Sequence, residues 1–253
     1  MTHPTNDRAA AGASQWDSPD YVDWWLGRIA RDSRREVEFA MVAAALPFDS
    51  EDTFRFLDLG AGHGALAGFL LGRFPRAQAV VLDGSAEMLQ RAEENLAHDA
   101  GRIIRRHASY ATSGWWEGLP PLRAVVSSRS IHNVCPVERP VLDLYREIRA
   151  LLPPGGAFIN LDHVGPGVPH LVPRFRQIAL DRQLRQRGAE LGRPVTVDEL
   201  QAERSPQQPH RAHAPNLPLN EHLRWLREAG FDLVECVWKD LNTTVMAGYV
   251  ASH

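Results

Sequence analysis

The stretch "LDLGAGHGALA", residues 57–67, most constrains the fold, because it places three glycines between a short apolar run and a helix-forming segment. Glycine lacks a Cβ, so a turn built on Gly60, Gly62 and Gly64 lets a ligand lie directly against the backbone. The next apolar run ends nineteen residues after Gly64 in an acid, Asp83. A carboxylate there can accept hydrogen bonds from both hydroxyls of a ribose. The pattern therefore predicts a strand–turn–helix unit that binds a nucleoside.

The spacing of the glycines narrows the choice of nucleotide. The dinucleotide fingerprint is G-x-G-x-x-G, whereas the third glycine here comes one residue too soon. The sequence also has no G-x-x-x-x-G-K-[ST] loop for a triphosphate. A nucleoside without phosphates fits better, because the helix then has no anion to bind. A nicotinamide-dependent oxidoreductase is the competing interpretation.

Short apolar runs alternate with helical patterns along most of the chain, which is typical of a parallel sheet with both faces covered. We expect strands at residues 54–59, 79–82, 103–104, 124–128 and 157–161. Two further strands, 231–239 and 243–251, have a short connection and should form an antiparallel hairpin. Ser18, Ser85 and Asn220 are expected to cap helices, and another helix is expected over 171–191.

Five segments in order carry a family resemblance: "FLDLGAGHGALA", "VVLDGSAEMLQRA", "VVSSRSIHNV", "LLPPGGAFINLDHV" and "LREAGFDLVECVWKDLNTTVMAGYV". Together they resemble the motifs of class I S-adenosylmethionine-dependent methyltransferases. The resemblance implies an α/β fold: a Rossmann-like, seven-stranded, mostly parallel sheet with helices on both faces and a C-terminal antiparallel hairpin. It also implies an N-terminal helical cap at 1–50 and a cofactor-binding domain at 51–253, with a helical substrate insertion at about 164–218.

The resemblance implies S-adenosyl-L-methionine as the cofactor. Asp58 would steady the turn and reach the ammonium group, and Asp83 would hold the ribose hydroxyls. Ser109 stands where the family usually has an acid near the adenine amine; a hydroxyl can accept the same bond more weakly. Arg123, just before the fourth expected strand, is a second departure, because the family often has an aspartate there. The implied cofactor-binding residues are Asp58, Gly60, Ala61, Gly62, Asp83, Gly84, Met88, Ser109, Tyr110 and Ser128.

The methyl group of a sulfonium is already activated, so an enzyme can act mainly by positioning and by excluding water. A general base is needed only where the acceptor carries a proton that must be removed. His132 and His163 are the candidate catalytic bases, because each follows a strand at the edge that faces the ligand. The alternative is that they only shape the pocket. Asp162 either orients His163 or a substrate, or caps the chain locally.

The acceptor is expected beside the cofactor, with Tyr21, Trp25, Arg129 and Asn133 as candidate contacts. Arg129 either meets a substrate carboxylate or forms a structural ion pair. Five arginines of the insertion either clamp an acidic substrate or form a solvated helix face with acidic partners: Arg174, Arg176, Arg182, Arg185 and Arg187. A pair of histidines, His210 and His213, favours a His-rich loop over a metal site, and no metal is expected.

The composition limits the partners. The 253 residues carry 28 basic and 31 acidic side chains, a net charge of −3, which argues against a nucleic-acid substrate. We expect a small-molecule substrate and no membrane; a homodimer is compatible with the sequence. The N-terminal residues lack the apolar segment of a signal peptide, and Cys135 and Cys236 form no paired motif. Both observations favour the cytoplasm.

The expected function is methyl transfer from S-adenosylmethionine to an oxygen, nitrogen or carbon of a small molecule. A cyclase or lyase that acts on the methionine part of the same cofactor is the alternative. A third class is a regulator that binds the cofactor without turnover.

Overall fold

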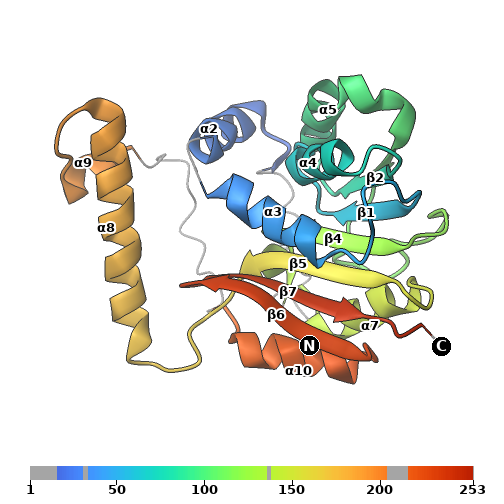
Figure 1. Ribbon diagram of the computed structural model, residues 1–253. Coiled ribbons are helices and arrows are strands. Elements are labelled where there is room, and N and C mark those ends of the chain that lie inside the picture. The colour runs from blue at the N-terminus through green and yellow to red at the C-terminus, as the bar shows by residue number, and fades with distance from the viewer. Residues whose placement is uncertain (1–15, 31–33, 136–137, 204–215, 253) are drawn as a thin grey trace, which may run out of the picture.

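The computed structural model describes residues 16–30, 34–135, 138–203 and 216–252. A central sheet has the strand order β3-β2-β1-β4-β5-β7-β6 (Figure 1). The strands are β1 (Arg55–Leu59), β2 (Gln78–Asp83), β3 (Ile103–His107), β4 (Ala124–Ser128), β5 (Ala157–His163), β6 (Leu233–Asp240) and β7 (Thr243–Tyr249). The first five run parallel, and β7 lies antiparallel between β5 and β6. The predicted Rossmann-like fold and its C-terminal hairpin are therefore confirmed.

Helices cover both faces of the sheet. The described helices are α2 (Pro19–Ile29), α3 (Arg35–Ala45), α4 (Ala65–Arg73), α5 (Ala86–Asn95), the 3₁₀ helix η1 (Ala97–Arg102), α6 (Ile131–Val134), α7 (Val141–Ala150), α8 (Leu171–Leu191), α9 (Val197–Ala202) and α10 (Leu219–Glu228). Apolar residues of α3, α4 and α5 pack in one buried cluster, and those of α7 and α10 pack in the other. Because both faces are buried, the central strands read as continuous apolar runs.

The strand order places a crevice where the predicted motifs meet. The chain moves from β1 outward to β2 and β3, and then returns to β4 on the other side of β1. At such a reversal the connections leave in opposite directions and open a gap beyond the carboxyl ends of the strands. The glycine turn follows β1, Asp83 ends β2 and Ser128 ends β4. These three segments therefore lie at one edge of the sheet.

Several local predictions can be checked at helix starts. Ser85 caps α5, since its hydroxyl accepts a hydrogen bond from Met88 N at 3.1 Å. Ser18 is the N-cap residue of α2, although its side chain makes no capping bond. The prediction that Asn220 caps the last helix is wrong: α10 begins at Leu219, with the extended residue Pro218 as its N-cap. A proline already fixes the extended entry, so Asn220 lies inside the first turn.

The insertion forms an arm that leaves the sheet (Figure 1). Its long helix α8 spans the predicted residues 171–191, and in the described part of the chain none of its residues is buried. A capping box between Thr196 and Glu199 starts α9. His210 and His213 lie outside the described residues. Among the helices that the structure describes, none is both long and apolar enough to cross a membrane.

Candidate functional site

A cavity of about 320 Å³ lies at this edge of the sheet, between the glycine turn and the N-terminal helices. All the predicted cofactor residues line it: Asp58, Gly60, Ala61, Gly62, Asp83, Gly84, Met88, Ser109, Tyr110 and Ser128. Residues from four separated parts of the sequence thus converge on one space. Their proposed roles toward a ligand stay predictions.

The glycine turn is held against the neighbouring strand by its own backbone. Gly60 N and Ala61 N both donate to Leu82 O, at 2.8 and 2.9 Å. Gly60 has a φ of +70°, and a Cβ at this position would lie 1.8 Å from Ser130 Oγ. Only glycine satisfies both the backbone angle and the close approach. The turn therefore presents bare backbone to the cavity.

Asp83 is fixed in place by backbone donors. Its Oδ2 accepts from Gly62 N at 2.8 Å, and its Oδ1 accepts from Ser85 N at 2.9 Å. Burial raises the pKa of this carboxyl above its ordinary value, and the backbone hydrogen bonds act in the opposite direction. The carboxylate is oriented at the end of β2, as a ribose-binding acid requires.

Asp58 is the second acid of the cavity and has an unusual environment. It is 1 % exposed, and its Oδ2 accepts from Ala67 N at 3.1 Å. Its Oδ1 is also buried, with no hydrogen-bond partner among the described residues. Burial raises the pKa of Asp58 to about 7. A carboxylate oxygen buried without a donor is costly, so a cationic ligand group in the cavity would relieve it.

The N-terminal segment closes the cavity over the start of α5. Trp16 O accepts from Ser85 Oγ at 2.7 Å, and the rings of Trp16 and Trp25 meet edge to face at 5.3 Å. Both tryptophans line the cavity. Tyr21 is not among the lining residues: it is 8 % exposed, and its ring centroid lies 5.2 Å from that of Trp16. That Tyr21 contacts a substrate stays a prediction.

Arg129 and Asn133 line the cavity beyond β4. Arg129 has a φ of +51°, rare for a residue with a side chain, and its Nη2 pairs with Glu38 Oε2 of α3 at 2.5 Å. Glu38 is fully buried. Of the two interpretations of Arg129, the structure shows the ion pair. Asn133 Nδ2 donates to Arg129 O at 3.2 Å and so supports this bend of the backbone.

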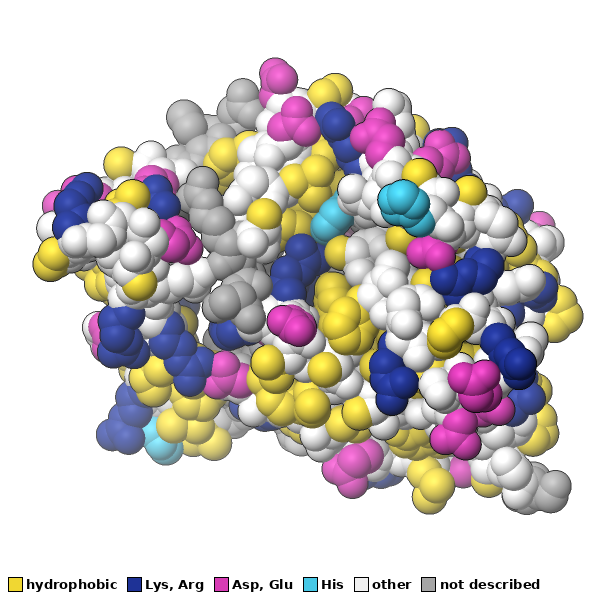
Figure 2. Space-filling model, turned by 45° about the horizontal axis from the view of Figure 1, so that its top comes forward, with side chains coloured by type: hydrophobic (Ala, Val, Ile, Leu, Met, Phe, Trp, Pro, Cys, Tyr) yellow, Lys and Arg dark blue, Asp and Glu magenta, His cyan; other side chains and the backbone are white. Residues whose placement is uncertain are grey.

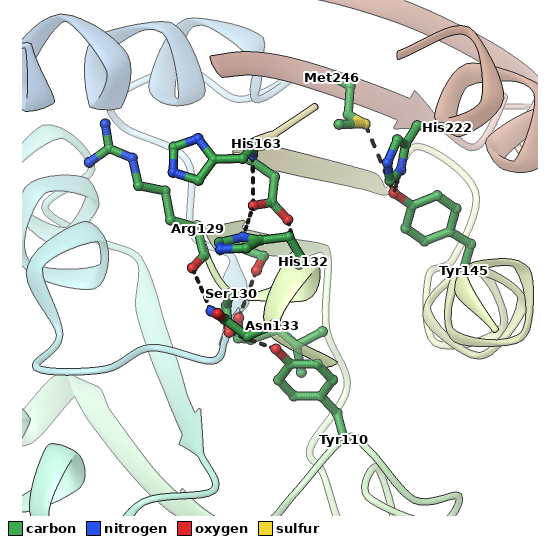
Figure 3. A network of polar contacts seen from close by, with 12 residues as sticks. Tyr110, Arg129, Ser130, His132, Asn133, Tyr145, His163, His222 and Met246 are labelled. Atoms are coloured by element: carbon green, nitrogen blue, oxygen red, sulfur yellow. Dashed lines mark hydrogen bonds and ion pairs between the residues drawn. The ribbon is translucent and has the colours of Figure 1, made fainter. Parts of the chain in front are cut away.

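The two candidate bases share one carboxylate (Figure 3). His132 Nδ1 lies 2.5 Å from Asp162 Oδ1, and His132 N donates to Asp162 Oδ2 at 3.1 Å. His163 N donates to the same carboxylate at 2.8 Å, and the two imidazole rings lie 5.0 Å apart. His132 directly precedes the lining residue Asn133, but neither histidine belongs to the cavity lining itself.

Burial and neighbouring groups determine the protonation of His163 and Asp162. Burial lowers the pKa of His163 to about 4, and its interaction with His132 acts in the same direction. Burial alone would raise the pKa of Asp162, but its interactions with His132 and His163 hold it below the ordinary value. Asp162 is therefore ionised near neutral pH and fixes the ring of His132.

Some lining residues carried no signal in the sequence. Trp16, Arg35, Phe39 and Ser130 all line the cavity. Ser130 Oγ lies 2.7 Å from Tyr110 OH. Trp16 lies two residues before the N-cap Ser18 of α2, and Arg35, Phe39 and Ser130 come from separate segments of the chain.

The arginines of the insertion lie on the projecting arm, where basic side chains gather (Figure 2). Arg182 pairs with Asp240 at 2.5 Å, and Arg187 pairs with Glu190 and Glu203, each at 2.9 Å. These contacts support a solvated helix face for Arg182 and Arg187. The remaining arginines are at least partly exposed: Arg174, Arg176 and Arg185.

Comparisons with known proteins agree with this geometry. Residues 57–158 match the family model described as a methyltransferase domain. A search of the curated proteins found no match. Many solved structures share the fold.

Three of these solved structures show how far each resembles this chain. An O-methyltransferase family protein from Burkholderia thailandensis is 17% identical, with a TM-score of 0.64 over 94% of this chain and 62% of its own. Human N-acetylserotonin methyltransferase in complex with SAM is 14% identical, with a TM-score of 0.60 over 99% and 61%. A putative S-adenosyl-L-methionine-dependent methyltransferase from Methanococcus maripaludis is 15% identical, with a TM-score of 0.57 over 100% and 98%.

This chain thus spans about three fifths of the first two structures and nearly all of the third. At these identities the structural likeness shows a shared fold alone. The sequence match adds that residues 57–158, less than half of the chain, are similar to a methyltransferase domain.

Proposed function

We propose that the protein transfers the methyl group of S-adenosylmethionine to a small-molecule acceptor. The observation that carries this proposal is the pairing of an oriented acid, Asp83, with a buried Asp58 oxygen that has no donor among the described residues. A ribose diol suits the first acid, and an ammonium group suits the second. The cofactor brings both groups, together with a methyl group activated by its sulfonium.

The remaining lining residues divide between the two ends of the cofactor. The backbone of Gly60 and Gly62 runs past the methionine part and the ribose, while Met88, Ser109 and Tyr110 flank the adenine. Ser109 is held by its own turn, since its Oγ accepts from Ala111 N at 3.3 Å. Trp16 and Trp25 cover the site and keep water away, which favours transfer because an ordered, dry pocket preserves the in-line geometry.

His132 is the base that we propose for an acceptor with a hydroxyl or amine proton. Asp162 holds its Nδ1, so that Nε2 remains the nitrogen that takes the proton. His163 is less suitable, because a pKa of about 4 makes its imidazole a weak acceptor. Asp162 acts through His132 and is a positioning residue.

Product analysis tests the proposal. The protein is incubated with methyl-labelled S-adenosylmethionine and a metabolite extract, and every labelled product is identified by mass spectrometry. S-adenosylhomocysteine together with a labelled acceptor supports methyl transfer. Accumulation of methylthioadenosine without an acceptor would show the cyclase or lyase reaction instead, and binding without turnover would indicate a regulator. A homodimer, a cytoplasmic location and the absence of a nucleic-acid substrate stay predictions.

A further inference from the structure

The loop that follows β3 is held from behind by a buried arginine. This loop carries two of the cavity residues, Ser109 and Tyr110. Arg139 lies just before α7, and its Nη1 donates to Tyr110 O at 2.9 Å. The side chain of Arg139 is only 8 % exposed. A guanidinium outside the cavity thus fixes the backbone of a residue that lines it.

A carboxylate of α7 holds the same arginine and a second point of the loop. Glu147 Oε2 lies 2.7 Å from Arg139 Nη2, and it accepts a hydrogen bond from the indole Nε1 of Trp115 at 2.8 Å. Trp115 is buried further along the same loop. Arg139 and Glu147 therefore anchor the loop at both Tyr110 and Trp115.

The side chain of Tyr110 supplies a third anchor. Its hydroxyl lies 2.7 Å from Ser130 Oγ (Figure 3). Ser130 is the N-cap residue of α6, the short helix that carries His132. The loop after β3 is thus held between α7 on one side and the loop after β4 on the other. Its backbone has little freedom to adapt to a different ligand.

Stability alone does not explain a buried ion pair behind this loop. Removing two charges from water costs about as much as their attraction returns, so apolar side chains of similar volume are often as stable. The pair differs from apolar packing in its fixed directions. The guanidinium presents its donors in one rigid plane, and Arg139 directs two of them at different acceptors. The ion pair thus gives the loop one defined position.

We propose that Arg139 and Glu147 are positioning residues, which hold the loop at Ser109 and Tyr110 in the arrangement that selects adenine over other bases. The inference rests on the proposed function, in which these two loop residues flank the adenine. Adenine accepts a hydrogen bond at N1 and donates from its 6-amino group, whereas hypoxanthine donates from N1 and accepts at its 6-oxo group. A serine hydroxyl can donate or accept, so Ser109 by itself does not distinguish these patterns. A backbone held in one position does.

The test compares S-adenosylhomocysteine with S-inosylhomocysteine, which differ only in the base. Calorimetry of the full chain measures both affinities for the wild type and for Arg139→Met, Glu147→Gln and Trp115→Phe. Arg146→Gln is the matched control, because Arg146 lies on the same helix and pairs with Asp143 at the surface. Thermal melting without ligand shows whether each variant is folded.

We expect the wild type to prefer S-adenosylhomocysteine, and Arg139→Met to narrow this preference about 10-fold. The released loop must be ordered by the adenine ligand, which lowers that affinity, while it can rearrange around the hypoxanthine ligand. Glu147→Gln and Trp115→Phe should act in the same direction with smaller effects, because each leaves one anchor of the loop in place. Arg146→Gln should leave both affinities unchanged.

Equal weakening of both ligands by Arg139→Met would overturn the inference, because it would assign the ion pair to the stability of the fold alone. A preference that no variant changes, or a wild type that binds both ligands equally, would overturn it as well. If Arg139→Met does not fold, Trp115→Phe decides, since it removes one hydrogen bond and keeps the aromatic packing. A wild type that binds neither ligand would instead refute the proposed function.

Discussion

Replacing Asp58 by asparagine should stabilise the ligand-free protein and should weaken its binding of the cofactor. The pKa of Asp58 is raised from 3.8 to about 7 by burial, so the folded state binds the proton more tightly than the unfolded state. The stabilising effect of this bound proton is complete below the pKa of the unfolded state and is lost as the pH rises through 7. The difference between a pKa of 3.8 and one of about 7 costs the folded state about 4 kcal/mol at neutral pH or above.

The amide introduced by Asp58→Asn would remove that cost but would leave its own Nδ2 donor without a partner, a penalty of about 1–3 kcal/mol. We therefore expect Asp58→Asn to raise the free energy of unfolding by about 1–3 kcal/mol at pH 8. The gain should shrink by about 2–3 kcal/mol at pH 5, because the wild-type carboxyl is then largely protonated.

Urea denaturation of the ligand-free chain at pH 5 and pH 8 measures both values, and calorimetry with S-adenosylmethionine measures the loss of affinity. Asp143→Asn is the control, since Asp143 is an exposed acid of α7 and should not change the pH dependence. A destabilisation by Asp58→Asn that is the same at both pH values would refute this reasoning.

The other predictions concern the turn, the ribose and the base. Gly60→Ala should destabilise the fold by about 1–3 kcal/mol and abolish cofactor binding, because the added Cβ would clash and the φ of residue 60 is positive. Gly72→Ala is the control, since its added Cβ meets open space and should not destabilise the fold. Thermal melting compares the two variants. Asp83→Asn should weaken the binding of adenosine and of S-adenosylhomocysteine by a similar factor, as calorimetry will measure. If the binding of only one of these ligands is weakened, the result contradicts a contact with the ribose. His132→Gln should lower kcat about 10²–10⁴-fold with little effect on cofactor affinity, and Asp162→Asn should shift the pH profile of kcat, whereas an unchanged profile would count against its positioning role.

Local patterns predicted the parts of the site that lie within a single segment. The glycine turn, Asp83 and the Ser85 cap depend on backbone angles and on residues a few positions apart, so a short stretch specifies them. The C-terminal hairpin follows from two strand patterns with a short connection.

Features that depend on long-range packing could not be predicted in this way. The Arg129–Glu38 pair joins residues 91 positions apart, and Trp16 meets Ser85 across 69 positions. Tyr21 and Trp25 share a helix and an aromatic character, yet of the two only Trp25 lines the cavity. Asn220 had a suitable side chain for a cap, but Pro218 already set the backbone of the helix entry.

A calorimetric titration of the full chain with S-adenosylhomocysteine, with NAD titrated in parallel, tests the central claim most directly. We predict saturable one-to-one binding of S-adenosylhomocysteine that Asp83→Asn weakens, and no binding of NAD. Absence of heat with S-adenosylhomocysteine, or saturable binding of NAD in its place, would contradict the account.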